Sequence, residues 1–296
     1  MSVLTVDQLS KNYGHIKALK EVSFSVPPGT VFGILGPNGS GKTTLLGIIM
    51  NVLQPTGGSY KLFNEEPTAA QRKLIGTLLE TPNFYHYLSA VQNLKIAASI
   101  KGRGEDDIDR VLEIVNLAHR KNSKFSTYSL GMKQRLAIAS ALLGNPDVLV
   151  FDEPTNGLDP VGIAEIRELI KKLSGQGKTI IMASHLLDEV EKVCTHVAIL
   201  KQGKLVTHGH VDEIFLHNDL IEIGSTDHRN LADILRNYPG AVDMKILDNC
   251  VQLFFEPGTA DLGAINKYCF EHGVILNKLD TKKRSLESKF FELTSN

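Results

Sequence analysis

Two segments near the N-terminus, residues 3–9 and 22–26, alternate apolar and polar residues with a period of two. Such alternation predicts strands that bury one face. A Pro-Pro-Gly turn at residues 27–29 then leads into a continuous apolar run, residues 31–35, which is typical of a strand buried on both faces. The pattern therefore predicts an antiparallel β layer that leads into a buried strand.

Further along, short apolar runs alternate with segments of helical periodicity. The strand-like runs include residues 59–63, 75–79, 148–152 and 179–183. From residue 82 to about residue 145 the pattern is helical instead, with apolar residues at i, i+3, i+4 and i+7, namely Ile108, Val111, Leu112 and Val115. Strands interspersed with helices predict an α/β fold, and the long helical stretch predicts a helical subdomain inserted between two strands.

After a hairpin turn at residues 201–204, the C-terminal part again alternates strand-like and helix-like runs, over a shorter length. Its strand-like runs are residues 220–223 and 251–255, and its helix-like runs are residues 231–235 and 262–270. We therefore expect two domains, residues 1–216 and a small α/β accessory domain, residues 217–296. The accessory domain contains no recognisable set of catalytic residues. Its expected role is regulation or subunit contact, and the alternative is that it only packs against the rest of the protein.

Composition narrows the class of protein. The chain has 296 residues, 42% of them hydrophobic and 22% charged, with a net charge of -1. It therefore lacks the overall basic excess of a nucleic-acid-binding protein, and no nucleic-acid partner is expected. The three cysteines, Cys194, Cys250 and Cys269, are far apart and indicate buried or inert thiols in a reducing cytoplasm. Neither an export signal nor an apolar stretch long enough to span a membrane is found, so any membrane role must come through a partner.

A glycine-rich loop follows the run 31–35 and precedes a helix-like segment, residues 44–50. Its spacing of Gly, four residues, Gly-Lys-Thr is that of the P-loop, in which backbone N–H groups turn toward phosphate oxygens. Lys42 would reach the β- and γ-phosphates, and Thr43 would place its hydroxyl on Mg²⁺. The alternative is an ordinary glycine turn, but the strand-loop-helix context favours a nucleoside triphosphate site. The predicted binding residues are Gly36, Pro37, Asn38, Gly39, Ser40, Gly41, Lys42, Thr43 and Thr44.

Two consecutive carboxylates, Asp152 and Glu153, stand at the end of the predicted buried strand that begins at Val148. Asp152 is positioned as a Walker-B aspartate that holds Mg²⁺. Glu153, one residue further, is free to polarise an attacking water as a general base. The alternative is a structural ion pair, since buried carboxylates need partners, but the P-loop favours the metal and base roles.

Three other positions carry weaker signals. Tyr13, in a loop before the phosphate site, could stack on a nucleobase or simply pack. Ser129 is a plausible N-cap, and the helix that it begins forms either a second anion site or an ordinary capped helix. His185 lies just past the carboxyl end of a strand, the edge where α/β sheets bind ligands, and can hydrogen-bond a γ-phosphate or the attacking water.

In their order and spacing, Tyr13, the P-loop, residues 129–134, the pair Asp152 and Glu153, residues 157–159 and His185 resemble the ATPase subunit of an ABC transporter, over residues 1–216. The resemblance implies that Tyr13 stacks on adenine and that Ser129 and Gly131 contact the γ-phosphate. It further implies a dimer contact from Asp159, a switch role for His185, and two subunits that face each other head to tail around ATP.

Two departures from the family pattern matter. The signature stretch reads Tyr128-Ser129-Leu130-Gly131-Met132 in place of the usual Leu-Ser-Gly-Gly-Gln, and Glu80 stands where the family usually has glutamine. A carboxylate is a stronger Mg²⁺ ligand than an amide, so Glu80 is predicted to bind the metal; alternatively it points to solvent or pairs with a lysine. The variant pair is similar to exporter ATPases of the bacitracin-resistance type, whose membrane partners are separate chains.

We therefore expect an ATPase that uses ATP and Mg²⁺, with Lys42, Glu153 and His185 as catalytic residues and Thr43, Glu80 and Asp152 at the metal. The expected partners are a second copy or a related ATPase subunit and an integral membrane permease, which would hold the chain at the cytoplasmic face of the membrane. An alternative is a soluble ABC-type ATPase that acts on ribosomes or DNA, although the segment between Glu80 and Ser129 is too short for the long coiled coil common in that class. A nucleotide kinase would not explain Glu153.

Overall fold

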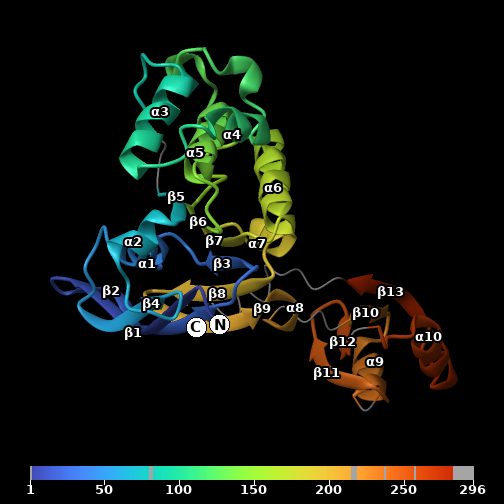
Figure 1. Cartoon of the computed structure of the whole chain (residues 1–296). Helices are drawn as coiled ribbons and strands as arrows, with labels where there is room; N and C mark the ends of the chain where they lie inside the picture. The colour runs from blue at the N-terminus through green and yellow to red at the C-terminus, as the bar shows by residue number, and fades with distance from the viewer. Residues whose placement is uncertain (1, 80–82, 215–218, 237, 257, 283–296) are drawn as a thin grey trace. The chain divides into compact units, whose positions relative to one another are not determined.

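The computed structural model describes residues 2–79, 83–214, 219–236, 238–256 and 258–282, which form two compact units, residues 1–211 and 212–296 (Figure 1). The chain is of the predicted α/β class, with parallel and antiparallel sheets. No helix in the described ranges combines the length and the apolar character needed to cross a membrane.

The centre of the first unit is a six-stranded sheet in the order β5-β6-β7-β3-β8-β9. Its strands pair in parallel except for β9, which runs antiparallel to β8. Every residue of β3, β6 and β7 is buried, because these strands are apolar on both faces. The strands are β3 (Val31–Leu35), β5 (Ile75–Leu78), β6 (Val148–Asp152), β7 (Thr179–Ser184), β8 (His196–Lys201) and β9 (Lys204–His210).

A second, antiparallel sheet in the order β2-β1-β4 forms a separate layer of this unit. It consists of β1 (Leu4–Tyr13), β2 (Ile16–Val26) and β4 (Gly57–Leu62), and one hydrophobic core joins it to the central sheet and to α1 (Lys42–Ile49). The alternation of the sequence ends the first strand at Leu9 and places Tyr13 in a loop. This prediction is wrong, because register shifts on either side of Leu9 interrupt the alternation while β1 continues to Tyr13.

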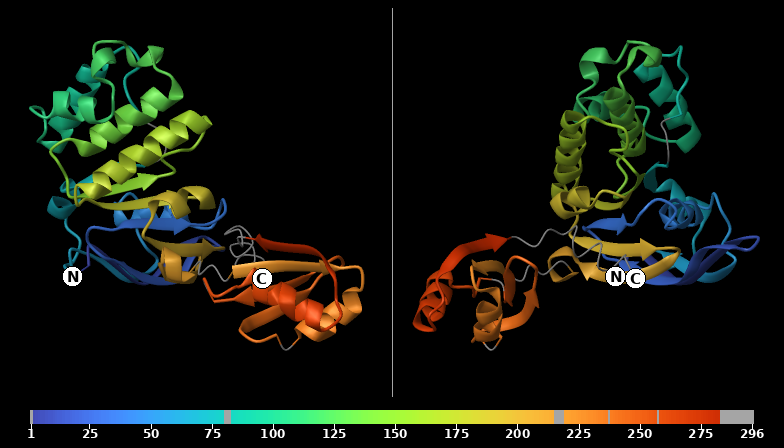
Figure 2. Two further views of the ribbon diagram at one scale, coloured as in Figure 1. Left: turned by 90° about the vertical axis from the view of Figure 1, so that its right-hand side faces the viewer. Right: turned by 180° about the vertical axis from the view of Figure 1, so that it is seen from behind.

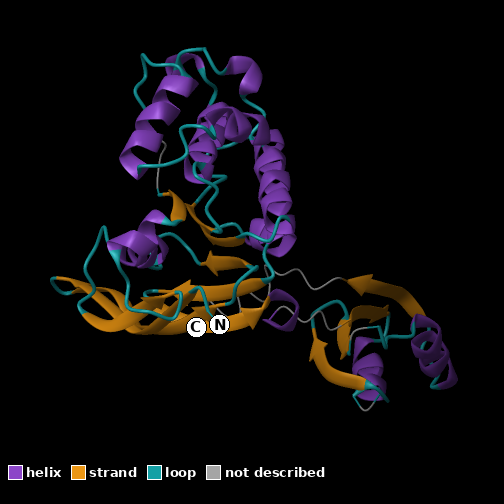
Figure 3. Cartoon of the chain, viewed as in Figure 1, coloured by secondary structure: helices purple, strands orange, loops and turns teal. Residues whose placement is uncertain are grey.

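The predicted helical insertion lies between β5 and β6, two neighbouring strands of the sheet. It contains α3 (Ala90–Lys101), α4 (Ile108–Ile114), α5 (Leu130–Leu142) and two short 3₁₀ turns, Ala118–Arg120 and Phe125–Thr127. These helices gather at one end of the unit, away from the antiparallel layer (Figures 2 and 3). The first unit also contains α2 (Ala69–Lys73), α6 (Pro160–Gly175) and α7 (Leu187–Val193), and the short helix α8 (Val211–Ile214) begins at its last residue.

The second unit is a four-stranded antiparallel sheet with the strand order β11-β12-β10-β13. The element order is β10 (Asp219–Ser225), α9 (His228–Leu235), β11 (Ala241–Ile246), β12 (Val251–Phe255), α10 (Leu262–Glu271) and β13 (Leu276–Lys282). This is the split βαβ arrangement of ferredoxin-like domains. Both helices share one core with the sheet, so they cover the face that carries Ile221, Ile223, Val251 and Leu253.

Sequence reasoning predicted β10, β12 and both helices of this unit but missed β11 and β13. Both are edge strands. β13 has only two leucines among polar and charged residues, so it shows no sustained alternation. β11 does alternate apolar and polar residues over residues 242–246, so its sequence carries a strand signal. The cysteines follow expectation, because Cys194, Cys250 and Cys269 are all buried with free thiols.

Candidate functional site

The loop between β3 and α1 is built around glycines that no other residue could replace without strain. Gly39 and Gly41 have left-handed φ angles of 78° and 106°, which favour glycine. A Cβ atom on Gly41 would lie 2.6 Å from the Ala18 carbonyl oxygen, and one on Gly36 would lie 2.3 Å from that of Leu200. The loop is therefore held tightly against the fold, with its backbone shape fixed by these contacts.

The first turn of α1 follows this loop directly. Gly41 is its N-cap residue, and no described side chain caps the helix. The N–H groups at this end thus remain available to an anion, which the helix dipole attracts to the same place. Ser40 adds a further polar group, since it is 1% exposed and its Oγ has no hydrogen-bond partner among the described residues. An unsatisfied buried hydroxyl inside a loop of this shape fits a phosphate-binding site.

Lys42 is almost completely buried, with 5% of its side chain exposed. Its Nζ donates to the carbonyl oxygens of Gly36, at 2.8 Å, and Pro37, at 3.3 Å. The same nitrogen forms an ion pair with Glu153 Oε1 at 3.3 Å. The loop therefore holds the ammonium at its centre, and Glu153 provides the opposite charge.

Glu153 follows the last residue of β6 and leaves the strand with a left-handed φ of 47°. This conformation is uncommon for a residue with a side chain and is found preferentially at functional sites. Its N–H donates to the Ala183 carbonyl of β7 at 3.0 Å, and its Oε2 lies 2.8 Å from His185 Nδ1. The three residues predicted to be catalytic, Lys42, Glu153 and His185, thus meet at the carboxyl edge of the central sheet.

A cavity of about 310 Å³ adjoins these residues. Its position at the carboxyl ends of β3, β6 and β7 is the one that α/β sheets use for ligands. It is lined by Ala18, Asn38, Gly39, Gly41, Lys42, Thr43, Thr44, Glu153, Asn156 and His185. Sequence reasoning did not single out Ala18 or Asn156. Asn156 could have been found from its place in the loop that follows Glu153, whereas nothing in the sequence marks Ala18.

The oxygen donors predicted for Mg²⁺ lie at the same end of the sheet. Thr43 is exposed and lines the cavity, and Asp152 is the last residue of β6 and only 2% exposed. Hydroxyl and carboxylate oxygens are the donors that this cation prefers, so these side chains fit it chemically. Glu80, the third predicted ligand, lies outside the described residues.

Of the predicted residues in the described ranges, Gly36, Pro37, Ser40 and Asp152 lie beside the cavity lining without being part of it. Tyr13, Ser129, Gly131 and Asp159 do not line the cavity either. Tyr13 is 45% exposed at the end of β1, with Lys11 Nζ 5.1 Å from its ring centroid. Ser129 is the N-cap of α5, as predicted, and its Oγ accepts from the Met132 N–H at 3.3 Å. Gly131 is in the first turn of the same helix. Asp159 is the N-cap of α6 and accepts from the Gly162 N–H at 2.8 Å.

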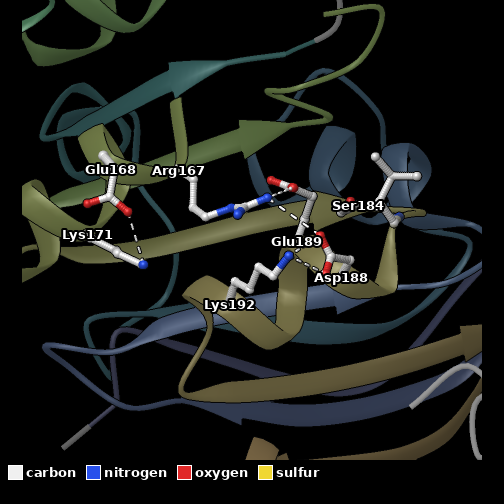
Figure 4. A network of polar contacts seen from close by, with 8 residues as sticks. Arg167, Glu168, Lys171, Ser184, Asp188, Glu189 and Lys192 are labelled. Atoms are coloured by element: carbon white, nitrogen blue, oxygen red, sulfur yellow. Dashed lines mark hydrogen bonds and ion pairs between the residues drawn. The ribbon is translucent and has the colours of Figure 1, made fainter. Parts of the chain in front are cut away.

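A network of ion pairs joins α6 to α7, the helix that follows His185 (Figure 4). Arg167 on α6 donates to Glu189 Oε1 at 2.7 Å and lies 3.5 Å from Asp188 Oδ2. Glu189 is only 2% exposed, so its carboxylate depends on this arginine. Ser184, at the end of β7, accepts from the Leu186 N–H at 3.0 Å. These bonds fix both helices that flank the His185 segment.

Comparison with known proteins is consistent with this geometry. A profile of the ABC transporter family matches residues 19–156. The chain is 34% identical to a bacitracin transport ATP-binding protein, BcrA, of Enterococcus faecalis, over 98% of this chain and 96% of the relative. It is 36% identical to the protein of the same name of Bacillus licheniformis, over 99% and 97%.

A dimeric ATP-binding cassette solved in a post-hydrolysis state with ADP and Pi is also similar in structure. The two chains superpose with a TM-score of 0.62 at 28% identity, over 70% of this chain and 98% of that one.

Proposed function

This chain belongs to the ABC transporter family as the ATP-hydrolysing subunit of an exporter, and we propose that its hydrolytic centre consists of Lys42, Glu153 and His185. The observation that carries the proposal is the position of the Glu153 carboxylate, between Lys42 Nζ at 3.3 Å and His185 Nδ1 at 2.8 Å. A general base needs both a fixed position and access to the proton that it accepts. Glu153 meets both conditions, because it lines the cavity and two neighbours fix its oxygens.

Each residue then has a defined task. Lys42 and the open N-terminus of α1 bind the phosphates of ATP. Thr43 and Asp152 hold Mg²⁺, which neutralises charge on the β- and γ-phosphate oxygens when it is bound. Glu153 accepts a proton from the attacking water, and His185 keeps the carboxylate turned toward the cavity. Phosphoryl transfer asks mainly for positioning and electrostatics, which this arrangement can supply.

Glu80 remains a proposed third ligand of Mg²⁺. If it contacts the metal, Glu80→Gln should tighten metal-free ATP binding, because it removes a negative charge near Asp152 and Glu153. ATP titrations with Mg²⁺ and with a chelator measure the gap between the two affinities. An unchanged gap would remove Glu80 from the metal site.

We further propose that two subunits pair head to tail around ATP. Ser129, Gly131 and Asp159 lie outside the phosphate cavity of their own chain, at the exposed starts of α5 and α6. The Ser129 oxygen accepts a backbone hydrogen bond, and its O–H remains able to donate to a phosphate. The similar cassette solved with ADP and Pi is dimeric, which supports pairing of two subunits. In such a two-fold dimer each triphosphate would be contacted by α1 of one subunit and α5 of the other.

The transport partner proposed for this ATPase is an integral membrane permease, which would hold the chain at the cytoplasmic face of the membrane. Exposed aromatic and aliphatic side chains near the carboxyl end of β5 support a protein contact there. Tyr85, Tyr87 and Ile100 are 52%, 68% and 78% exposed. The names of the relatives make bacitracin-like peptide antibiotics the first cargo to test.

The catalytic proposal is tested by Glu153→Gln, which keeps the shape of the side chain but removes its basicity. We expect ATP binding to persist and phosphate release to fall by about 10²- to 10⁴-fold. Glu168→Gln is a matched control, since Glu168 lies on the exposed side of α6 and pairs with Lys171. Hydrolysis at the wild-type rate in Glu153→Gln would exclude Glu153 as the base.

We place the domain boundary at residue 216. The compact unit that contains every cavity residue ends at Val211, which supports a cassette that is complete before the accessory domain begins. A chain that ends at residue 216 should therefore stay in solution and bind ATP with wild-type affinity. Aggregation of this shortened chain would mean that the C-terminal unit is needed to complete the core of the cassette.

A further inference from the structure

The edge strand β11 of the C-terminal unit has an unpaired side. Its inner side pairs with β12, and no described strand pairs with the outer side. Open strand edges are sites of association unless charges, prolines or covering elements protect them. Here apolar side chains are exposed along the edge, since Val242 and Ile246 are 54% and 55% exposed. Leu247, just beyond the strand, is 39% exposed.

The direction of the backbone groups on β11 follows from two hydrogen bonds. The Leu247 N–H donates to the Cys250 carbonyl across the β11-β12 hairpin at 2.9 Å. Because N–H groups alternate in direction along a strand, those of Met244 and Ile246 point away from β12. In agreement, the Met244 N–H donates at 2.8 Å to the side chain of its own neighbour Asp243. The outward amide of Met244 thus has an acceptor that a partner strand could replace.

The sequence of this edge is complementary to itself when it is reversed about Met244. An antiparallel copy centred there places Val242 opposite Ile246 and Asp243 opposite Lys245. Asp243 and Lys245 are exposed, and neither has an ion-pair partner among the described residues. Opposite charges on directly facing residues stabilise an antiparallel pair, and facing apolar residues do the same. A lysine on an edge strand usually disfavours pairing with another strand. In this register, however, Lys245 faces Asp243 of the second copy, so its charge favours pairing.

The backbone supports the same register. A two-fold axis at Met244 makes Met244 and its counterpart a hydrogen-bonded pair, because both outward amides and carbonyls face each other. Asp243 and Lys245 of the partner then form the adjacent non-hydrogen-bonded pair, in which side chains lie closest. Side-chain chemistry and amide direction, two independent features, thus select one alignment out of several possible ones.

From this agreement, we infer that β11 is an interaction surface for a second copy of this chain. Two C-terminal units join edge to edge in an isologous contact, and their sheets continue into one another. The contact uses no residue of the ATP site and does not require nucleotide. A single strand edge buries less surface than a standard stable interface, so the association is weak and appears only at high protein concentration.

Charge reversal tests this inference on the full-length chain without nucleotide, by sedimentation equilibrium over a wide concentration range. Asp243→Lys or Lys245→Asp places like charges face to face twice in each dimer and should weaken association at least about tenfold. The double variant Asp243→Lys/Lys245→Asp restores opposite charges and should return the dissociation constant to within about threefold of wild type. Failure of the double variant to recover, or no self-association of the wild type, would overturn the inference.

Cysteine cross-linking tests the register itself. Met244→Cys should form a disulfide-linked dimer under mild oxidation, because facing residues in a hydrogen-bonded pair have the Cα separation that a disulfide needs. Asp243→Cys and Lys245→Cys should not cross-link alone but should do so when mixed. The wild type is the control, since its three cysteines are buried. Equal cross-linking at residues 243 and 244 would contradict the proposed alignment.

The nucleotide-free association through β11 can be distinguished from the ATP-driven dimer of the cassette by one variant. Ser129→Arg changes the helix end proposed to meet ATP and leaves β11 intact, so it should keep the nucleotide-free association at wild-type strength. If Ser129→Arg abolishes that association, the nucleotide-free contact belongs to the cassette and the inference about β11 is wrong. Failure of the ATP-driven dimer alone would leave the β11 result unaffected.

Discussion

Two helices of the cassette, α1 and α5, are both proposed to point their N-terminal ends at ATP, and they begin in opposite ways. The N-cap of α1 is Gly41, which offers no side chain to the first turn. The N-cap of α5 is Ser129, whose oxygen accepts from the Met132 N–H. The other end of α5 is also capped, because Lys101 donates to the carbonyls of Ser140 and Ala141. The first turn of α1 therefore has no side-chain cap among the described residues, whereas α5 is capped by its own chain at both ends.

The glycines at the starts of these two helices, Gly41 and Gly131, also differ in how strongly the fold requires them. Gly41 is required by the fold, since its φ is 106° and a Cβ atom there would meet the Ala18 carbonyl oxygen at 2.6 Å. Gly131 has room, because a Cβ atom on it would lie 3.9 Å from its nearest neighbour, Leu158 Cδ2. This contrast is consistent with the proposal that the P-loop serves its own chain and that the signature stretch contacts a second chain.

The largest expected effect is on the ATP-driven dimer. Ser129→Arg places a long cation at the start of α5, which should prevent association with Mg·ATP in the Glu153→Gln background while leaving ATP binding by the monomer intact. Light scattering measures the first and nucleotide titration the second. Ser99→Arg, at an exposed position of α3, controls for the added charge. If Ser129→Arg still forms the dimer normally, the start of α5 does not face a partner subunit, and the proposed difference between α1 and α5 is wrong.

The glycine contrast predicts a smaller effect on binding by the monomer. Gly41→Ala forces a side chain into a strained conformation and should weaken ATP binding by about 10- to 100-fold. Gly131→Ala should leave the affinity within about twofold of wild type. Both are measured with a fluorescent ATP analogue at low protein concentration. Equal losses in the two variants would mean that the signature glycine also serves its own chain.

Substitutions at Ser129 can separate its cap from its proposed contact with phosphate. Ser129→Ala removes the cap and should lower the free energy of unfolding by about 1 kcal/mol, as followed by urea denaturation. Ser129→Asp keeps a capping oxygen and should recover this loss. Its negative charge should nevertheless repel the phosphates, so ATP hydrolysis stays low. Recovery of both stability and turnover in Ser129→Asp would show that the cap is the only role of Ser129.

The far end of α5 predicts a pH dependence. Burial, with a smaller effect from Arg103, lowers the pKa of Lys101 to about 8. Between pH 8 and pH 10.5 the unfolded chain therefore binds more protons than the folded one, so the Lys101 contribution to stability rises with pH. We expect the wild type to gain about 2 to 3 kcal/mol relative to Lys101→Met across this window, since one pKa unit corresponds to about 1.4 kcal/mol. A constant difference between the two proteins would contradict the lowered pKa.

The centre of the site was predictable from the sequence because parallel strands end at one edge of a sheet. This places the loop after β3, the carboxylates after β6 and the histidine after β7 side by side. The ion pair between Arg167 and Glu189 could not be foreseen, because the two residues are 22 positions apart on different helices. The extent of β1 was missed because bulges interrupt its alternation of apolar and polar residues. β11 could have been predicted, since residues 242–246 alternate apolar and polar side chains.

The place of β3 in the central sheet has a consequence for protein synthesis. This strand pairs with β7 and β8, and the Gly29 N–H just before it donates to Thr179, 150 residues later in the chain. At a typical synthesis rate, about 10 to 30 s pass between the two ends of that interval. For this time the ribosome carries an apolar segment that has no partner strand. Chaperone binding to the nascent chain should therefore rise when residues 31–35 emerge and fall only after β8 is complete.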